Sequence, residues 1–103
     1  SAKDCGKLLE NIYRGTCVSK KYSGEMLNLL KHQQVRYKIP AGLPSGIVCA
    51  NKTGETSSVQ HDIAIIYGKK TTYVLCVFSS GASEGHLQYG IRNISSMVYN
   101  YLN

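Results

Sequence analysis

The sequence has no run of about 20 apolar residues and no recognisable signal peptide, so it predicts no membrane-spanning segment. It has no internal repeat and no low-complexity tract. Its four cysteines, Cys5, Cys17, Cys49 and Cys76, include no Cys-x-x-Cys spacing, which argues against a zinc site or a redox motif. We therefore expect no metal and no cofactor. Cys49 and Cys76 lie in apolar runs and are predicted to be buried free thiols, although in a secreted protein they could pair.

Acidic residues are few: six Asp and Glu stand against 12 Lys and Arg, which gives a formal net charge of +6. Such a balance can indicate binding to nucleic acid. Here, however, the lysines form separate pairs at predicted turns, Lys20-Lys21 and Lys69-Lys70, with no interleaving of arginine and aromatic residues. A solvated basic surface is the better interpretation, and we expect no nucleic-acid partner.

The rest of the composition is that of a folded chain, because 43% of its 103 residues are hydrophobic and 17% are charged. A helical segment is predicted over residues 1–34, a connector with both prolines over 35–46, and a C-terminal helix over 83–103. Ser1 and Asp4 resemble a capping box, and a second helix is predicted from Ser19 or Ser23 to about Gln33. The apolar stripe predicted for the last helix consists of Leu87, Ile91, Ile94, Val98 and Tyr101 or Leu102.

Three antiparallel strands are predicted within residues 47–80, at about 46–54, 60–67 and 72–79, which makes the fold class α+β. Gly68-Lys69-Lys70 is typical of a hairpin turn between the last two strands. Residues 63–67 and 73–78 are nearly continuous apolar runs, and these predict a sheet that is covered on both faces. The chain itself is expected to be too short to cover both.

The stretch from Ile47 to Glu55 holds the candidate site. It is a strand of β-branched and small residues that ends in Lys52, Thr53 and Gly54. A lysine in a half-buried strand needs a partner for its charge, because an unpaired ammonium loses hydration. Side chains alternate along a strand, so Lys52 and Thr53 can serve one pocket only at a sheet edge. These residues therefore predict a cationic strand edge that binds an anion, with a glycine that lets a ligand approach the backbone.

The residues around this triplet make the pattern specific. Ile39-Pro40-Ala41-Gly42-Leu43-Pro44 precedes it and His61-Asp62-Ile63-Ala64-Ile65-Ile66-Tyr67 follows it. The whole chain resembles the C-terminal portion of class A β-lactamases, serine hydrolases marked by Lys-Thr-Gly, and covers about two-fifths of a usual member. The resemblance implies the C-terminal part of the β-lactamase/transpeptidase-like fold, a β-lactam as ligand, the N-terminal part of the same domain as partner, and a secreted or cell-envelope location.

The resemblance also implies a role for each residue of the triplet and for the residue after it. Lys52 would hydrogen-bond the serine of a separate Ser-Asp-Asn motif and attract the substrate carboxylate. Thr53 would donate its hydroxyl to that carboxylate, and Gly54 would leave room for the substrate. The backbone N–H of Glu55 would be one of two oxyanion-hole donors. Lys52 and Glu55 are thus the catalytic candidates, and residues 52–55 together form the predicted substrate-binding site.

Two positions depart from the usual family pattern. Glu55 stands where a small residue or serine is common, and its charge is expected to repel substrate carboxylates. Neither Gln60 nor His61 is the arginine that many relatives use to bind that carboxylate, which leaves Arg92 as the only late candidate. His61 is predicted to be a structural hydrogen-bonding residue.

No Ser-x-x-Lys and no Ser-Asp-Asn occurs in the sequence, so this chain by itself is predicted to be inert. Three interpretations stay open: part of a hydrolytic β-lactamase, part of a penicillin-binding transpeptidase, carboxypeptidase or sensor, and a non-catalytic binding module. In the family's sheet, further strands pair beside the strand at about residues 72–79. Without them that apolar edge is exposed, and self-association is expected.

Overall fold

The computed structural model describes all 103 residues as three α-helices, one short 3₁₀ helix and three strands. In chain order these are α1 (Ala2–Arg14), α2 (Lys20–Lys31), η1 (Pro40–Gly42), β1 (Val48–Glu55), β2 (Val59–Tyr67), β3 (Thr72–Ser80) and α3 (Glu84–Leu102). The strands form one antiparallel sheet in the order β1-β2-β3. The predicted α+β class and three-stranded sheet are therefore confirmed.

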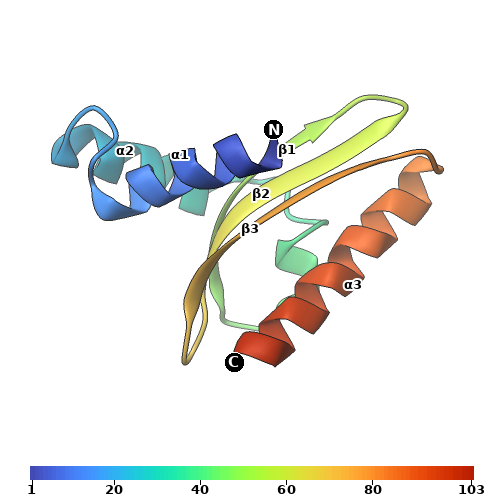
Figure 1. The fold of residues 1–103 in the computed structure, drawn as a ribbon. Helices are drawn as coiled ribbons and strands as arrows, with labels where there is room; N and C mark the ends of the chain where they lie inside the picture. Colours follow the sequence, from blue (N-terminus) through green and yellow to red (C-terminus); the bar gives the residue numbers. More distant parts are fainter.

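The sheet lies between two layers of helix, with α1 and α2 on one face and α3 with η1 on the other (Figure 1). Each face has its own buried cluster. Leu9, Ile12, Ala50 and Ile65 form the cluster under α1 and α2. The cluster under α3 consists of Ile39, Cys49, Ala64, Ile66, Ile91 and Tyr99. Both faces are covered over β1 and β2, but β3 keeps exposed apolar residues, so the expectation that the chain is too short to cover both faces holds for β3.

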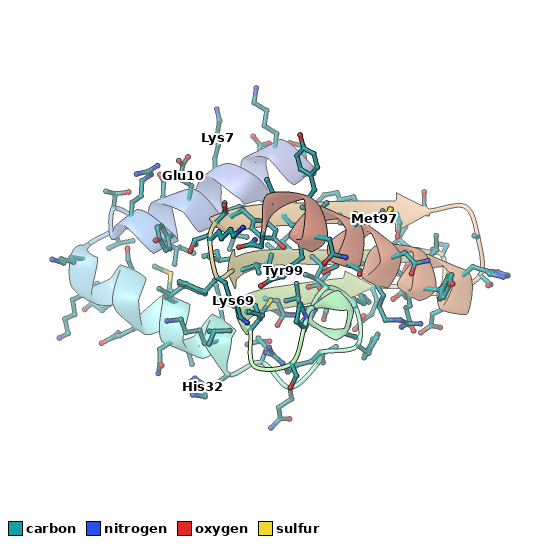
Figure 2. The ribbon with its side chains drawn as sticks, turned by 90° about the horizontal axis from the view of Figure 1, so that it is seen from below. Lys7, Glu10, His32, Lys69, Met97 and Tyr99 are labelled. Carbon is teal, nitrogen blue, oxygen red and sulfur yellow. The ribbon has the colours of Figure 1, made fainter.

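The predicted apolar stripe of α3 is partly wrong. Ile91 is buried as expected, but the side chains of Ile94 and Tyr101 are 37% and 89% exposed. The buried positions are instead Ile91, Ser95 and Tyr99, while Met97 lies on the exposed side of the helix (Figure 2). A serine occupies a core position here because its hydroxyl donates a hydrogen bond of 2.7 Å to the carbonyl of Ile39.

The connector packs closely against α3 at Gly42. A Cβ atom at this position would collide with the carbonyl oxygen of Arg92 and the Cβ of Ser95, so only glycine fits. At the C-terminal end of α3, the side chain of Asn103 accepts hydrogen bonds from the backbone N–H groups of Lys70 and Thr71. These contacts fix the middle of α3 to the connector and its C-terminal end to the turn between β2 and β3.

The helix starts follow the predicted capping residues. The Ser1 hydroxyl accepts from the N–H of Asp4, and the Ser19 hydroxyl accepts from the N–H of Tyr22. All four cysteines are free. Cys49 is buried, and burial raises the pKa of its thiol to about 12. Cys76 is only half-buried, because β3 is the outer strand on its side of the sheet, so the prediction for this thiol is partly wrong.

Candidate functional site

Residues 52–55 form the end of β1, and β1 is an outer strand of the sheet. Only β2 pairs with it, in a register that sets Gly54 opposite His61 and Glu55 opposite Gln60. The predicted strand edge is therefore present, and the four candidate residues are contiguous along it.

The backbone of this edge is oriented by its pairing with β2. Just beyond the strand, the N–H of Thr56 donates to the carbonyl of Val59 at 3.0 Å. Successive residues of an antiparallel strand direct their N–H and C=O groups alternately toward and away from the partner. The N–H and C=O groups of Glu55, and likewise those of Thr53, therefore face away from β2, toward the open side of the sheet.

The side chains of Lys52 and Thr53 start on opposite faces of the sheet. Thr53 is buried on the same face as Cys49 and Asn51, whereas Lys52 is exposed on the α1–α2 face. The lysine side chain nevertheless returns to the edge, because its Nζ donates to the carbonyl of Thr53 at 2.7 Å. An ammonium group thus lies beside the free backbone groups of the strand.

Residues 35 and 36 of the connector contact the first half of the β1 edge, whereas Tyr37 and Lys38 reach its far end only through the side chain of Glu55. Arg36 donates from Nη2 to the carbonyl of Cys49 at 3.4 Å, and the side-chain amide of Asn51 donates to the carbonyl of Val35 at 3.2 Å. Farther along, a Cβ atom added at Gly54 would meet no atom within 4 Å. The open part of the edge therefore coincides with residues 53–55.

The carboxylate of Glu55 is held in an ion pair that sequence reasoning missed. Lys38 Nζ donates to its Oε2 at 2.6 Å, and the Tyr37 hydroxyl donates to the same oxygen at 2.9 Å. The hydrogen bond from Lys38, followed by that from Tyr37, lowers the pKa of Glu55. The sequence alone predicts that the charge of Glu55 repels substrate carboxylates. In the structure the positive charge of Lys38 offsets that negative charge. The only sequence signal was a lysine directly before the Ile39-Pro40 turn.

Asp62 holds the connector in the position from which Lys38 reaches the strand. It is fully buried on β2, where its Oδ2 accepts from the N–H of Ile39 at 2.9 Å and its Oδ1 accepts from Asn51 Nδ2 at 3.2 Å. Burial raises the pKa of this carboxyl, while the two hydrogen bonds and the charge of Lys38 oppose that rise. Asp62 thus joins β1, β2 and the connector directly beneath the candidate edge.

The two remaining candidates have structural contacts. His61 Nδ1 accepts a hydrogen bond of 3.2 Å from the backbone N–H of Ser79, and its ring stacks on Phe78 with centroids 4.3 Å apart. The predicted structural role of His61 is confirmed. Arg92 donates to the carbonyl of Tyr37 at 3.0 Å and lies against the connector. It is therefore committed to holding α3 to the connector.

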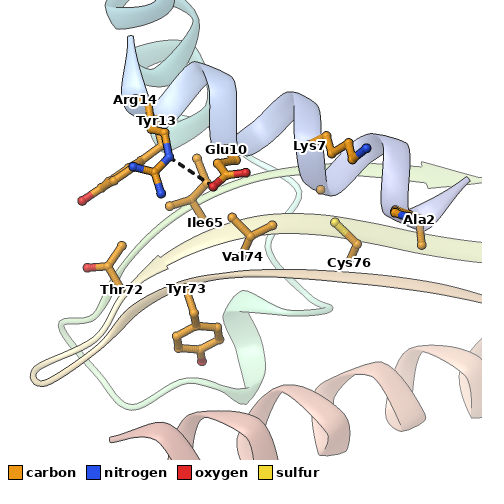
Figure 3. A pocket seen from close by; sticks show the side chains of 12 residues that line it. Ala2, Lys7, Glu10, Tyr13, Arg14, Ile65, Thr72, Tyr73, Val74 and Cys76 are labelled. Carbon is orange, nitrogen blue, oxygen red and sulfur yellow. Dashed lines mark hydrogen bonds and ion pairs between the residues drawn. The ribbon is translucent and has the colours of Figure 1, made fainter. Parts of the chain in front are cut away.

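A second feature is a groove of about 650 Å³ between α1 and β3, remote from β1. Its walls include Lys7, Glu10, Val74 and Cys76, and the sheet residues Ile65, Val74 and Cys76 point toward α1 (Figure 3). The lining combines apolar sheet residues with charged residues of α1. Val74 and Phe78 on β3 are 37% and 42% exposed.

No group of three or more His, Cys, Asp or Glu side chains in the structure is arranged to hold a metal ion. None of the helices combines the length and the apolar character that a membrane crossing needs.

Replacement of Gly54 by alanine is expected to separate folding from ligand binding. The added methyl group meets no atom of this chain, so the free energy of unfolding should change by less than about 0.5 kcal/mol. If a ligand lies along the edge, the same methyl should weaken its binding or acylation by about tenfold or more. Thermal unfolding and penicillin acylation of the complete protein provide the two measurements. An unchanged acylation rate would show that nothing approaches the backbone at Gly54.

Comparison with known proteins agrees with the fold. The profile of the beta-lactamase enzyme family matches residues 1–102. Among solved structures, a β-lactamase from Sphaerobacter thermophilus superposes with a TM-score of 0.89 at 24% identity, over 96% of this chain and 39% of that one. PBP-A matches with a TM-score of 0.86 at 23% identity, over 96% of this chain and 38% of that one. The extended-spectrum β-lactamase TLA-3 matches with a TM-score of 0.84 at 26% identity, over 94% and 39%.

The chain therefore spans about 38–39% of the length of these solved structures. The comparison with curated proteins gives no significant match.

Proposed function

The chain belongs to the beta-lactamase enzyme family, and from this premise we propose that it supplies the carboxylate-binding and oxyanion-binding side of a serine active site that reacts with β-lactams. The observation that carries the proposal is the open edge at residues 53–55, where outward-facing backbone groups lie beside the Lys52 ammonium. Such an edge offers donors to an anion and to a developing oxyanion.

In this proposal the nucleophile is a serine in the rest of the domain. Its oxygen bonds to the β-lactam carbonyl carbon, the ring C–N bond breaks, and the serine proton ends on the ring nitrogen. Water then hydrolyses the acyl-serine ester. Glu55 N–H stabilises the oxyanion of each step, while Lys52 and the Thr53 hydroxyl bind the substrate carboxylate. No metal takes part in these steps.

The direct test is covalent labelling by benzylpenicillin, measured by intact mass spectrometry. This chain alone has no Ser-x-x-Lys and should keep its unmodified mass of 11.3 kDa. The complete protein, or this chain combined with the rest of its domain, should gain one acyl group. A stoichiometric adduct on the isolated chain, or no adduct on the complete protein, would contradict the proposal.

A specific observation favours a second candidate, a penicillin-binding protein that is acylated but hydrolyses the ester slowly. PBP-A is among the similar structures, and a mutant of it has been solved as an acyl-enzyme complex with penicillin G. Turnover of a chromogenic cephalosporin by the complete protein separates the two. Rapid turnover identifies a β-lactamase, whereas a long-lived adduct without turnover identifies a penicillin-binding relative. Either activity is proposed to operate outside the cytoplasm, in a secreted or cell-envelope protein.

We also propose that the remainder of the domain packs against the outer edge of β3 and the groove beside it. These surfaces are exposed here and carry apolar residues of β3, and the matched structures are more than twice as long as this chain. An open apolar edge recruits other strands, so the isolated chain should self-associate. Light scattering over a range of concentrations should show species larger than 11.3 kDa. A clean monomer at high concentration would contradict this prediction.

A further inference from the structure

Lys38 carries a charge in a position where charges are rarely found. Its side chain is fully buried, although lysine is almost never buried without a partner. It has two partners on two strands: the Glu55 carboxylate at the end of β1, and the carbonyl of His61 on β2 at 3.1 Å. Because His61 lies opposite Gly54, the ammonium bridges the two strands beside the Gly54–Glu55 peptide.

That peptide contains the N–H proposed for the oxyanion hole, and its inner side is held by the pairing of Gly54 with His61 on β2. Gly54 has no side chain and no heavy atom within 4 Å of its missing Cβ. Glycine has the widest backbone freedom, and the outward face of the strand makes no hydrogen bond to a further strand. The side chain of Glu55 is therefore an anchor that this end of β1 has in addition to its pairing with β2.

The anchor is built more firmly than a surface ion pair. The Glu55 side chain is 37% exposed but the Lys38 side chain is 0% exposed, so solvent reaches only one partner. Tyr37 donates to the same carboxylate oxygen, and Arg92 in turn donates to the Tyr37 carbonyl. Asp62 fixes the next connector residue by accepting from the N–H of Ile39. The connector that carries Lys38 is thus held by α3 and by the sheet.

We infer that the buried Lys38–Glu55 ion pair is a positioning device for the proposed reaction, which fixes the Glu55 N–H in the direction of the oxyanion. The inference rests on the proposed function, because it explains the Glu55 side chain by the role proposed for the Glu55 backbone N–H. Lys38 touches no substrate and acts only through Glu55. A displaced oxyanion donor slows the chemical step more than it weakens substrate binding.

The test uses the complete protein and four variants: Lys38→Met, Glu55→Ala, the double variant, and Glu25→Gln as control. Glu25 is exposed on α2 and lines neither the candidate site nor the groove between α1 and β3. Acylation by benzylpenicillin is followed by rapid mixing, which gives a rate constant, a half-saturating concentration and an amplitude. The amplitude reports the fraction of folded protein, so a loss of stability lowers the amplitude without changing the rate constant.

Each single variant at the ion pair should lower the saturating acylation rate about tenfold or more, with the half-saturating concentration within about threefold. The double variant should be no slower than the slower single variant, because both changes remove one interaction. The control should match the wild type. If Lys38→Met fails to fold, Glu55→Ala still decides, because the Glu55 side chain is partly exposed and alanine removes the acceptor for both Lys38 and Tyr37.

Saturating rates within threefold of wild type in folded Glu55→Ala would overturn the inference and leave the proposed function intact. A double variant whose loss is the product of the two single losses would also overturn it. If the wild-type protein is not acylated at all, the proposed function fails and this inference fails with it.

Discussion

Replacement of Lys52 by alanine is expected to lower the specificity constant of the complete protein for a β-lactam by about 30- to 1000-fold, equivalent to roughly 2–4 kcal/mol. In the structure the ammonium lies at the strand edge on the carbonyl of Thr53, in a position to attract a carboxylate from the open side. Its contacts in the proposed site strengthen as charge develops in the transition state, so the catalytic constant should fall together with affinity.

Two matched variants sharpen this prediction. Lys52→Arg should retain more activity than Lys52→Ala, because the charge is preserved. Thr53→Ser should be nearly silent, because it keeps the hydroxyl. Steady-state kinetics with a chromogenic cephalosporin at fixed ionic strength provide the measurement. If Lys52→Ala stays within threefold of wild type, Lys52 is an ordinary surface residue.

The second large effect is expected for Asp62→Asn, on stability. The Asp62 carboxylate now accepts from the Ile39 N–H at 2.9 Å and from the Asn51 side-chain amide at 3.2 Å. Asparagine has the same shape, but one of its two terminal groups is an NH₂, which would face one of these donors and could not accept from it. One hydrogen bond is then lost in the core, and Lys38 loses a nearby negative charge. Burial already disfavours the ionised carboxyl, which offsets part of the cost. We expect a net loss of about 2 kcal/mol in the free energy of unfolding.

Denaturant unfolding of the complete protein measures this loss. Asp4→Asn is the natural control, because Asp4 is the only other aspartate and its side chain is 80% exposed, so its replacement should cost about 0.5 kcal/mol or less. Equal stability of the two variants would show that Asp62 does not join the connector to the sheet in solution.

The sequence was sufficient to predict the elements of the fold because their signals are local. Ser1 and Ser19 cap the helices as expected, and the apolar run of β2 reflects burial on both faces of the sheet. The apolar run of β3 lies at the open edge, where no residue is fully buried. The stripe on α3 was less predictable. Ser95 is a core residue only because the carbonyl of Ile39, 56 residues away in the chain, accepts its hydroxyl proton.

The position of the candidate residues at a strand edge could be predicted, but the contacts that support them could not. Residues 52–55 form a motif that can be read from the chain, and the structure places them at a strand edge as expected. The pairing of Lys38 with Glu55 joins residues 17 apart across an irregular connector, so no periodicity reveals it. The charge of Glu55 was consequently interpreted as repulsive, although a buried lysine faces it.

The most direct test of the account is a crystal structure of the complete protein acylated by benzylpenicillin. The account predicts that the acyl carbonyl oxygen lies about 2.7–3.1 Å from the backbone nitrogen of Glu55, with the ligand along residues 53–55 and its carboxylate beside Lys52. An acyl group whose carbonyl oxygen points away from Glu55, with the edge of β1 free of ligand, would contradict it.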